Sequence, residues 1–468
     1  MLSTPPGGNA EHRGWLAATG LPELIRVLGL AMQPAKIGLA LAAIIATFFL
    51  GTALDWVWTR GGGIPNDAVA QFTRSCESGL PLPEEKGDRG VFSVWCEHQQ
   101  HCILGFLGSS IPGASFGAEP PVGSLSQYRV GVHPFRHLAS MMYGVLWLVR
   151  CHSVFFILFA AGSLLIWSLC GGAICRLAAM QFAREEKLTM TQGLDYARER
   201  MFGGFFLAPC IPLAFVAFLA VLLTFGGVML RVPWLGDLLS VFFILALLGG
   251  FAIVLLLMGL AVGGNLFWPV VAAEGSDAFD AFSRGLAYTY SRPWRTIWYF
   301  AFSTVFASVC WLFAHFLVFS TLAITRGVMA WGTSPFGWWL RGDEGSRVSK
   351  LELLWPNAGG SMLHAWPDWS QLGYLERLSG LVIGLYVLLT VALLWAFLAS
   401  LYFSATTVIY FLLRRDVDGA DIGDVFVEYE SGGTDSTSTS GGARPLPIVT
   451  GGSSESPPPT AAGSIPAP

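Results

Sequence analysis

Long apolar runs alternate with short polar stretches along the 468-residue chain, and this alternation predicts the fold. Apolar runs of about 18 residues or more are typical of helices that cross a membrane. We place spans at residues 37–54, 153–175, 201–230, 238–271, 297–323 and 379–413. The fourth would be about 51 Å long at roughly 1.5 Å per residue, so it must tilt or bend. We expect the bend at Gly249 and Gly250.

The stretch between the fourth and fifth spans predicts a short amphipathic helix at the membrane surface. Its apolar positions are Phe279, Phe282, Leu286 and Tyr290, and its polar positions are Asp277, Asp280 and Arg284. Ser276 is the expected N-cap, and Pro293 is expected to end the helix. We expect the apolar side to lie against the inner ends of the spans or the lipid interface, with the polar side facing water.

The polar stretches divide the chain into three parts. Residues 1–36 form an N-terminal segment with an interfacial helix, residues 37–413 the transmembrane domain, and residues 414–468 an acidic and then disordered tail. The outer loops cover residues 55–152 and 324–378. In the first loop, residues 92–106 are expected to form an amphipathic helix and residues 135–149 a surface helix that leads into the second span.

Composition agrees with an all-α, polytopic helical membrane bundle of about six transmembrane helices. Hydrophobic residues make up 53% of the chain and charged residues 12%, well below the roughly 25% of soluble proteins. The net charge of −4 argues against a nucleic-acid partner. Lys and Arg near the span ends place both termini in the cytoplasm by the positive-inside rule, which indicates a multi-pass protein of the cell inner membrane.

A cluster of thiols and imidazoles in the first outer loop is the sharpest candidate for chemistry. Cys96, His98, His101 and Cys102 are candidate metal ligands, because Cys and His at short spacing bind zinc or copper. A second ligand pair, which a closed zinc site requires, is absent nearby. The alternative is a disulfide from Cys76 to Cys96 or Cys102. We therefore predict no metal and no cofactor.

Three further histidines complete the candidate chemistry. His133 and His137 are four residues apart but have no zinc-protease motif around them, so we expect them to face water or headgroups. His315 lies well inside the fifth span, where an ionisable group is a functional hypothesis. We favour a neutral histidine that bonds to a carbonyl or a serine. No catalytic pairing is evident, so we predict no enzymatic activity.

The linkers GLDYARERMFGGFF and AFSRGLAYTYSRPWRTIWYF each enter a span through an Arg-rich end. With the Arg-Pro-Trp-Arg sequence, the stretch from Gly171 to Trp298 resembles uncharacterised bacterial polytopic inner-membrane proteins. It is also similar to the membrane domain attached to some glycerophosphodiester phosphodiesterases. The resemblance implies no catalytic residue here, because in those enzymes the chemistry lies in a separate soluble barrel.

Two functional classes remain. The first is a non-enzymatic scaffold or accessory subunit, with the lipid bilayer and other membrane or cytoplasmic proteins as partners. The alternative is a transporter or permease component, for which Pro209, Pro212 and the Gly249–Gly250 pair could provide broken helices. Ion or proton coupling needs polar groups at depth, and His315 and Asn265 are the candidates. We favour the first class.

Overall fold

The computed structural model describes residues 20–78, 87–110, 134–340, 351, 354–355 and 372–426. Within these residues the expected all-α fold is confirmed, and six helical segments are long and apolar enough to cross a membrane. The helices are α2 (Leu21–Ala31), α3 (Pro34–Trp58), η1 (Thr59–Gly61), α4 (Ala68–Ser78), α5 (Val91–Ser110), α6 (Pro134–Cys151), α7 (Ser153–Arg184), α8 (Met190–Glu199), η2 (Met201–Phe206), α9 (Leu207–Met229), α10 (Leu235–Ser240), α11 (Phe243–Gly263), η3 (Gly264–Leu266), α12 (Phe267–Glu274), α13 (Ala278–Ser291), α14 (Pro293–Leu340) and α16 (Tyr374–Asp418).

Local sequence explains where several helices begin and end. A proline occupies the first turn of both α2 and α3, where its missing N–H costs nothing. Thr189 and Gln192 form a reciprocal capping box at the start of α8. Gly275 and Gly419 end α12 and α16 with φ values of 65° and 67°, a left-handed conformation that favours glycine.

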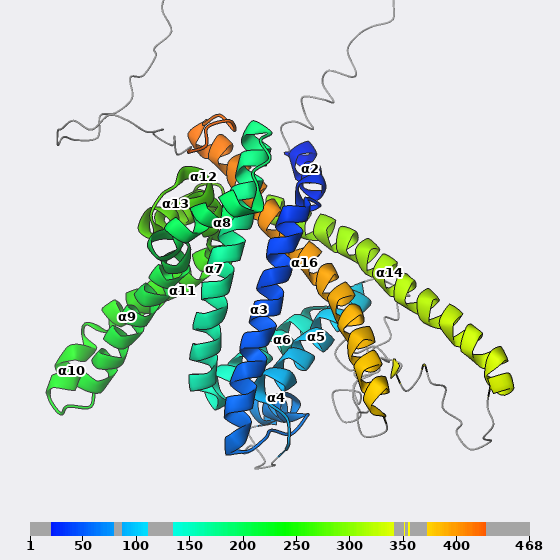
Figure 1. Cartoon of the computed structure of the whole chain (residues 1–468). Coiled ribbons are helices and arrows are strands. Elements are labelled where there is room, and N and C mark those ends of the chain that lie inside the picture. The colour runs from blue at the N-terminus through cyan, green and yellow to red at the C-terminus, as the bar shows by residue number, and fades with distance from the viewer. Residues whose placement is uncertain are drawn as a thin grey trace, which may run out of the picture. The chain divides into compact units, whose positions relative to one another are not determined.

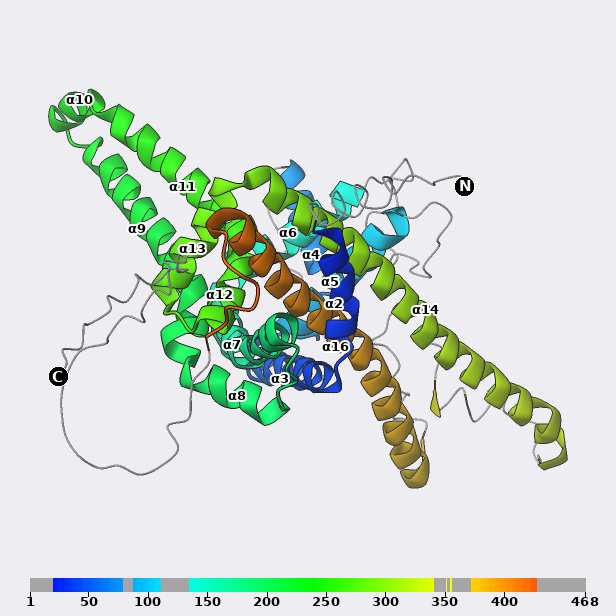
Figure 2. The same ribbon diagram turned by 90° about the horizontal axis from the view of Figure 1, so that it is seen from above.

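Helices α3, α7 and α16 pack against one another at the centre of the bundle (Figure 1). The antiparallel pair α9 and α11 leaves this centre on one side, and α14 leaves it on another (Figures 1 and 2). Both arms expose large apolar side chains, among them Phe218, Val221, Phe251 and Phe316. Such exposure is costly in water and favourable in lipid, so these arms are suited to the bilayer.

The main core lies at the end of the bundle where α2 begins and α16 ends, which we call the platform end (Figure 1). Every residue from Gly171 to Met180 of α7 is buried there. The same holds for residues 403–413 of α16 and residues 266–267 and 269–273 around α12. Side chains are therefore most completely buried within the protein at this end, and they are most exposed along the arms, which are suited to lipid.

A second core lies at the opposite end, where α4, α5 and α6 pack against α3 and α7. Asp55 of α3 caps α5, because its carboxylate accepts the amides of Phe92 at 2.7 Å and Ser93 at 3.0 Å. Trp147 and Leu148 of α6 are buried in this core. The helices between the first two spans thus pack on the spans and on each other. The helix predicted at residues 135–149 is present as α6, which buries one side and leaves Leu138 and Met142 exposed.

The fourth span is interrupted at a different place from the one predicted. Helix α11 runs unbroken through Gly249 and Gly250, and the interruption is the 3₁₀ turn η3 at Gly264–Leu266. A Cβ atom at Gly263 would lie 2.9 Å from Thr289 Oγ1 and 3.0 Å from the Gly285 carbonyl oxygen. The close approach of α13 therefore requires small residues here, and it places the change of helix type at this crossing.

Candidate functional site

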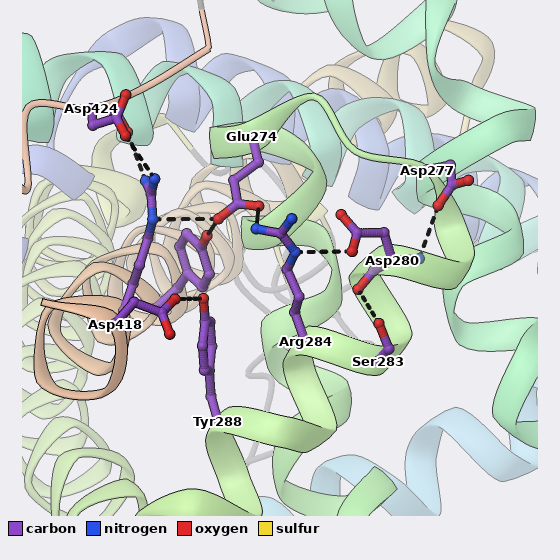
Figure 3. Close-up of polar contacts among 10 residues, drawn as sticks. Glu274, Asp277, Asp280, Ser283, Arg284, Tyr288, Asp418 and Asp424 are labelled. Atoms are coloured by element: carbon purple, nitrogen blue, oxygen red, sulfur yellow. Dashed lines mark hydrogen bonds and ion pairs between the residues drawn. The ribbon is translucent and has the colours of Figure 1, made fainter. Parts of the chain in front are cut away.

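A largely buried carboxylate, Glu274, is the centre of a polar network at the platform end (Figure 3). Its side chain is 10% exposed and accepts hydrogen bonds from the guanidinium of Arg284 and the hydroxyl of Tyr410. Arg414 Nε lies 3.4 Å from the same carboxylate. The network thus joins the end of α12 to α13 and α16, which are far apart in the sequence. Such a buried charge is stable because it is paired and hydrogen-bonded.

Hydrogen bonds within the first turns of α13 orient the Arg284 side chain towards Glu274. Asp277, and not the predicted Ser276, caps the helix, because its carboxylate accepts the Asp280 amide at 2.8 Å. Asp280 then binds Arg284 Nε at 2.9 Å, one turn later on the same helix. The Arg284 side chain is 43% exposed. Asp280 and Arg284, which were expected simply to face water, therefore form a chain of ion pairs that leads inward to Glu274.

The side of α13 that packs on protein lies about one position away from the predicted stripe. It consists of small residues and two polar ones: Ala278, Ala281, Gly285, Tyr288 and Thr289. Phe282 and Leu286 are half-buried, whereas Phe279 is 58% exposed and Tyr290 is also exposed. A Cβ atom at Gly285 would lie 2.7 Å from the Phe267 ring, so a larger residue does not fit at that position. Burial of Phe279 against the spans is therefore wrong, and the lipid interface remains for it. Tyr290 is exposed on one side but lies against the fourth span, because its hydroxyl donates to the Leu255 carbonyl of α11.

Two further carboxylates at the end of α16 extend the network. Asp418 accepts the hydroxyl of Tyr288, and burial together with this hydrogen bond raises the pKa of the Tyr288 phenol. Asp416 accepts the hydroxyl of Tyr299 and pairs with Arg295, both at 2.8 Å. The last turns of α16 are thereby tied to both α13 and α14.

Three arginines hold consecutive backbone carbonyls of residues 424–426, an arrangement that we call the tail clamp. Arg414 donates to the Asp424 carbonyl at 2.6 Å and to its carboxylate at 3.0 Å. Arg184 reaches the Val425 carbonyl at 3.3 Å, and Arg176 the Phe426 carbonyl at 2.8 Å. The Phe426 amide donates to the Ala273 carbonyl at 2.9 Å. The acidic segment after α16 is therefore docked, at least as far as Phe426.

Arg176 of the tail clamp also belongs to a cluster with Arg200 and the buried ring of Tyr196. Arg176 is buried in α7 and also donates to the Ala272 carbonyl at 2.8 Å. Its guanidinium lies 4.1 Å from the centre of the Tyr196 ring, and that of Arg200 lies 5.1 Å from it. Tyr196 donates its hydroxyl to the Val271 carbonyl at 2.9 Å. A cation at this depth is tolerated because carbonyl dipoles and the aromatic face surround it.

A second cation, Lys36, is buried in α3 at 0% exposure. Its ammonium donates to the Leu30 carbonyl at 3.0 Å and to Gln181 Oε1 at 2.9 Å. Lys36 precedes the predicted span 37–54 directly, and Arg176 follows the predicted span 153–175 directly. Both are instead parts of the protein core at the platform end, where they join helices.

The candidate metal ligands lie on α5 and contact α6. His98 Nε2 is 3.0 Å from the Ser140 carbonyl oxygen and 3.5 Å from Cys102 Sγ. His101 lies 4.0 Å from Glu97. Burial, with the carboxylates of Glu97 and Asp55, raises the pKa of the Cys96 thiol to about 11, which disfavours the thiolate that a metal needs. Within the described ranges, no three His, Cys, Asp or Glu side chains gather as a metal site.

The other cysteine and histidine candidates differ in their exposure and surroundings. Cys76 on α4 is a free, exposed thiol, and Cys96 and Cys102 are also free, so neither proposed disulfide is formed. His133 lies outside the described residues. His315 is buried in α14, with its ring centre 5.0 Å from that of Trp311. Its ring also stacks on that of Phe319, with centres 6.2 Å apart, and the expected bond to a carbonyl or a serine stays a prediction.

An apolar cavity of about 760 Å³ lies between α14 and α16 and the tips of α5 and α6. Its lining includes Phe106 of α5, Met141 of α6, Trp167 of α7, Trp311 of α14 and Phe403 of α16. At the edge, Tyr402 donates to the Asn265 side chain at 2.5 Å. The volume lies within the roughly 300–1,000 Å³ that is common for small-molecule sites.

Several residues of these sites were not predicted from the sequence. Glu274 and Arg176 each follow an apolar run directly, and a charge in that place is a usable signal for a buried ion pair or a carbonyl ligand. Tyr410 gives no such signal, because it lies 136 residues from Glu274. No protein-family model, no curated protein and no solved structure matches this chain.

Proposed function

We propose that the protein is a non-enzymatic scaffold or accessory subunit of the cell inner membrane, with the platform end and both termini in the cytoplasm. The positive-inside rule supports this orientation, since arginines concentrate at the platform end. These include Arg176, Arg184, Arg198, Arg200, Arg284, Arg292, Arg295, Arg414 and Arg415. The expected partners are the lipid bilayer and a membrane or cytoplasmic protein.

The tail clamp is the observation that supports this proposal. Three arginines from α7 and α16 hold residues 424–426 through backbone carbonyls, so the segment from Val427 onward starts at a set point of the platform. The composition of that segment favours a polar chain that orders when it binds. Anchoring one end beside a platform raises the effective concentration of the tail at that surface. A partner could then contact the tail and platform together.

Orientation is tested with reporter fusions. Fusions after Arg200, Arg295 and Arg415 should report the cytoplasm, and fusions within residues 81–89 and 343–350 the opposite side. A reporter after Arg415 that reads extracytoplasmic would exclude the proposed orientation.

The scaffold role is tested by crosslinking in native membranes. A photo-reactive amino acid at Ile448 should capture a specific protein, and truncation after Phe426 should abolish its co-purification without changing the thermal stability. Arg184→Ala should weaken co-purification, since it removes one carbonyl contact of the tail clamp. Arg198→Ala is the matched control, because it removes an arginine from neighbouring α8. Unchanged co-purification after truncation would contradict the proposal.

The apolar cavity favours a second candidate, a transporter component for a lipophilic cargo. Its lining is almost entirely hydrocarbon, so a charged solute has no partner there. A fluorescent lipid in proteoliposomes tests this role through the fraction that a membrane-impermeant quencher reaches. Transport requires that fraction to rise with protein content, and a constant fraction would exclude it for that lipid.

A further inference from the structure

We propose that Cys76 and Cys151 form a native disulfide that joins α4 to α6 at the end of the bundle opposite the platform. The bond depends on the proposed orientation, which places this end outside the cytoplasm, and not on the scaffold role. It differs from both bonds that the sequence suggested, which joined Cys76 to Cys96 or Cys102. Helix packing, exposure and electrostatic proximity each favour this pair.

Cys76 continues the buried side of α4. Val69, Phe72 and Thr73 are buried, and Cys76 follows them at the spacing that keeps residues on one side of a helix. Val69 and Phe72 belong to the core that α4 shares with α6. Cys76 therefore lies one turn beyond this core, on the side of α4 that packs on protein.

Cys151 occupies the corresponding position on α6. Gly144, Trp147 and Leu148 are buried, and Cys151 follows them at the same helical spacing. Trp147 and Leu148 lie in the same core as the apolar residues of α4. Each helix thus carries a cysteine in its last turn, on the side that packs on the shared core.

The electrostatics of Cys151 place its sulfur close to that of Cys76. Burial raises the pKa of the Cys151 thiol, the Cys76 thiolate raises this pKa further, and Arg150 acts in the opposite direction. A charge at an exposed position influences a neighbour only over a short range, because water and salt screen it. The two thiols therefore repel each other as thiolates, and a covalent bond between the sulfur atoms removes this repulsion.

Exposure selects the same two thiols. Of the eight cysteines, all of which lie within the described residues, Cys76 and Cys151 are exposed and the others are buried or half-buried. An oxidant must reach a sulfur atom in order to react with it. The competing Cys102 on α5 is buried, and its Sγ lies 3.5 Å from His98 Nε2. Oxidation should therefore favour the pair between α4 and α6.

The bond forms by exchange with a protein or small-molecule disulfide, the class of oxidant that acts in extracytoplasmic compartments. The thiolate of one cysteine attacks a sulfur of the oxidant, which forms a mixed disulfide and expels the second oxidant sulfur as a thiolate. The thiolate of the other cysteine then attacks the protein sulfur of the mixed disulfide and releases the remaining oxidant sulfur. The two cysteines lose two protons and two electrons, and the oxidant becomes two thiols.

The disulfide would close a loop of chain that contains α5. Such a crosslink stabilises mainly by restricting the unfolded chain, and the effect grows with the length of the loop. A phosphine reductant should therefore lower the midpoint of thermal unfolding of the wild type. Cys76→Ser has no bond to reduce, so its midpoint should not respond. An equal response of the two proteins would contradict the bond.

Thiol counting in cells tests the native bond. Cells are quenched in acid, the protein is denatured, and a polyethylene-glycol maleimide labels every free thiol before electrophoresis. The wild type should lack labels on two of its eight cysteines. Every remaining thiol should be labelled in Cys76→Ser and in Cys151→Ser. The matched controls Cys96→Ser and Cys102→Ser should still lack two labels, and full labelling in either would overturn the proposed pairing.

Peptide mapping identifies the partners without a variant. Trypsin cleaves after Arg74, Lys86 and Arg150. Digestion without reduction should therefore release residues 75–86 linked to a peptide that begins at Cys151. A link from residues 75–86 to a peptide with Cys96 or Cys102, or a disulfide-linked dimer of the whole chain, would overturn the bond.

Oxidation of purified protein separates the geometry from the orientation. Fully reduced wild type in mild detergent is treated with oxidised glutathione, and the pair should close there whichever side of the membrane it occupies in cells. Failure to close would overturn the geometry. Closure in detergent with eight free thiols in cells would overturn the native bond, and the reporter fusions would then show whether a reversed orientation is the reason.

Discussion

Removal of the Glu274 carboxylate is the most informative perturbation of the platform. In Glu274→Ala, Arg284, Arg414 and Tyr410 lose their common acceptor. The Arg414 side chain is 13% exposed, so water can replace the carboxylate only in part. Breaking a buried pair from one side costs about 3–5 kcal/mol. Because Arg284 is 43% exposed and can rehydrate, we expect the loss of unfolding free energy to lie at the lower end of this range, about 3 kcal/mol.

The matched control removes a carboxylate from the same network at its surface. Asp280→Ala also deprives Arg284 of a partner, but both side chains are more than a third exposed, at 38% and 43%. Such pairs contribute about 0–1 kcal/mol. Glu274→Gln should lie between the two, since its amide oxygen still accepts one hydrogen bond but the charge is gone.

Unfolding by sodium dodecyl sulfate from a mild detergent, followed by near-ultraviolet circular dichroism, measures these free energies. The expected order of destabilisation is Glu274→Ala, then Glu274→Gln, then Asp280→Ala. Equal destabilisation by Glu274→Ala and Asp280→Ala would refute the view that burial makes Glu274 the centre of the network.

Three further predictions concern α3 and α5. Gly51→Ala should destabilise the protein by about 1–3 kcal/mol, because its Cβ would lie 2.5 Å from the Phe92 ring. Gly38→Ala is the control, since a Cβ there would meet nothing within 4 Å, and it should stabilise the protein by about 0.5–1 kcal/mol in the same unfolding assay. Asp55→Ala should cost about 1–2 kcal/mol and speed hydrogen exchange at the first amides of α5, and unchanged exchange there would contradict its capping role. Burial lowers the pKa of His98, so its contribution to stability is fully present above its ordinary pKa of 6.5 and is lost as the pH falls below that value. His98→Gln should therefore reduce the loss of stability on acidification, and an unchanged pH profile would show that His98 does not titrate in this way.

The membrane architecture could be predicted because it follows from local composition. Each span is a run of apolar residues, and runs of this length leave few alternatives. Helix ends were less accurate, since Asp277 and Ser276 are equally good caps and the choice depends on how α13 docks. The interruption of the fourth span at Gly264–Leu266 was missed for a related reason. Gly249 and Gly250 resemble a weak point, but Gly263 is where another backbone comes close.

The candidate site was mostly beyond such reasoning. Lys36 and Arg176 stand where flanking charges stand in many membrane proteins, and their burial depends on carbonyls from distant segments. The aromatic stripe on α13 was placed only in part, because Gly285 and not an aromatic residue lies against Phe267, and the buried side is shifted by about one position. Pairwise contacts between remote segments leave no periodicity in one sequence, so neither Tyr410 nor Phe426 could be assigned a role.

The long sequence separations within the platform have a consequence for biosynthesis. Glu274 is synthesised 136 residues before Tyr410, and Arg176 is synthesised 250 residues before Phe426. At roughly 5–20 residues per second, the arginine exists for about 10–50 s before its final acceptor leaves the ribosome. Lys36 has the Leu30 carbonyl at once but must await Gln181. The nascent chain therefore enters the membrane with its cations incompletely compensated, and the last helix and the residues just after it complete the assembly.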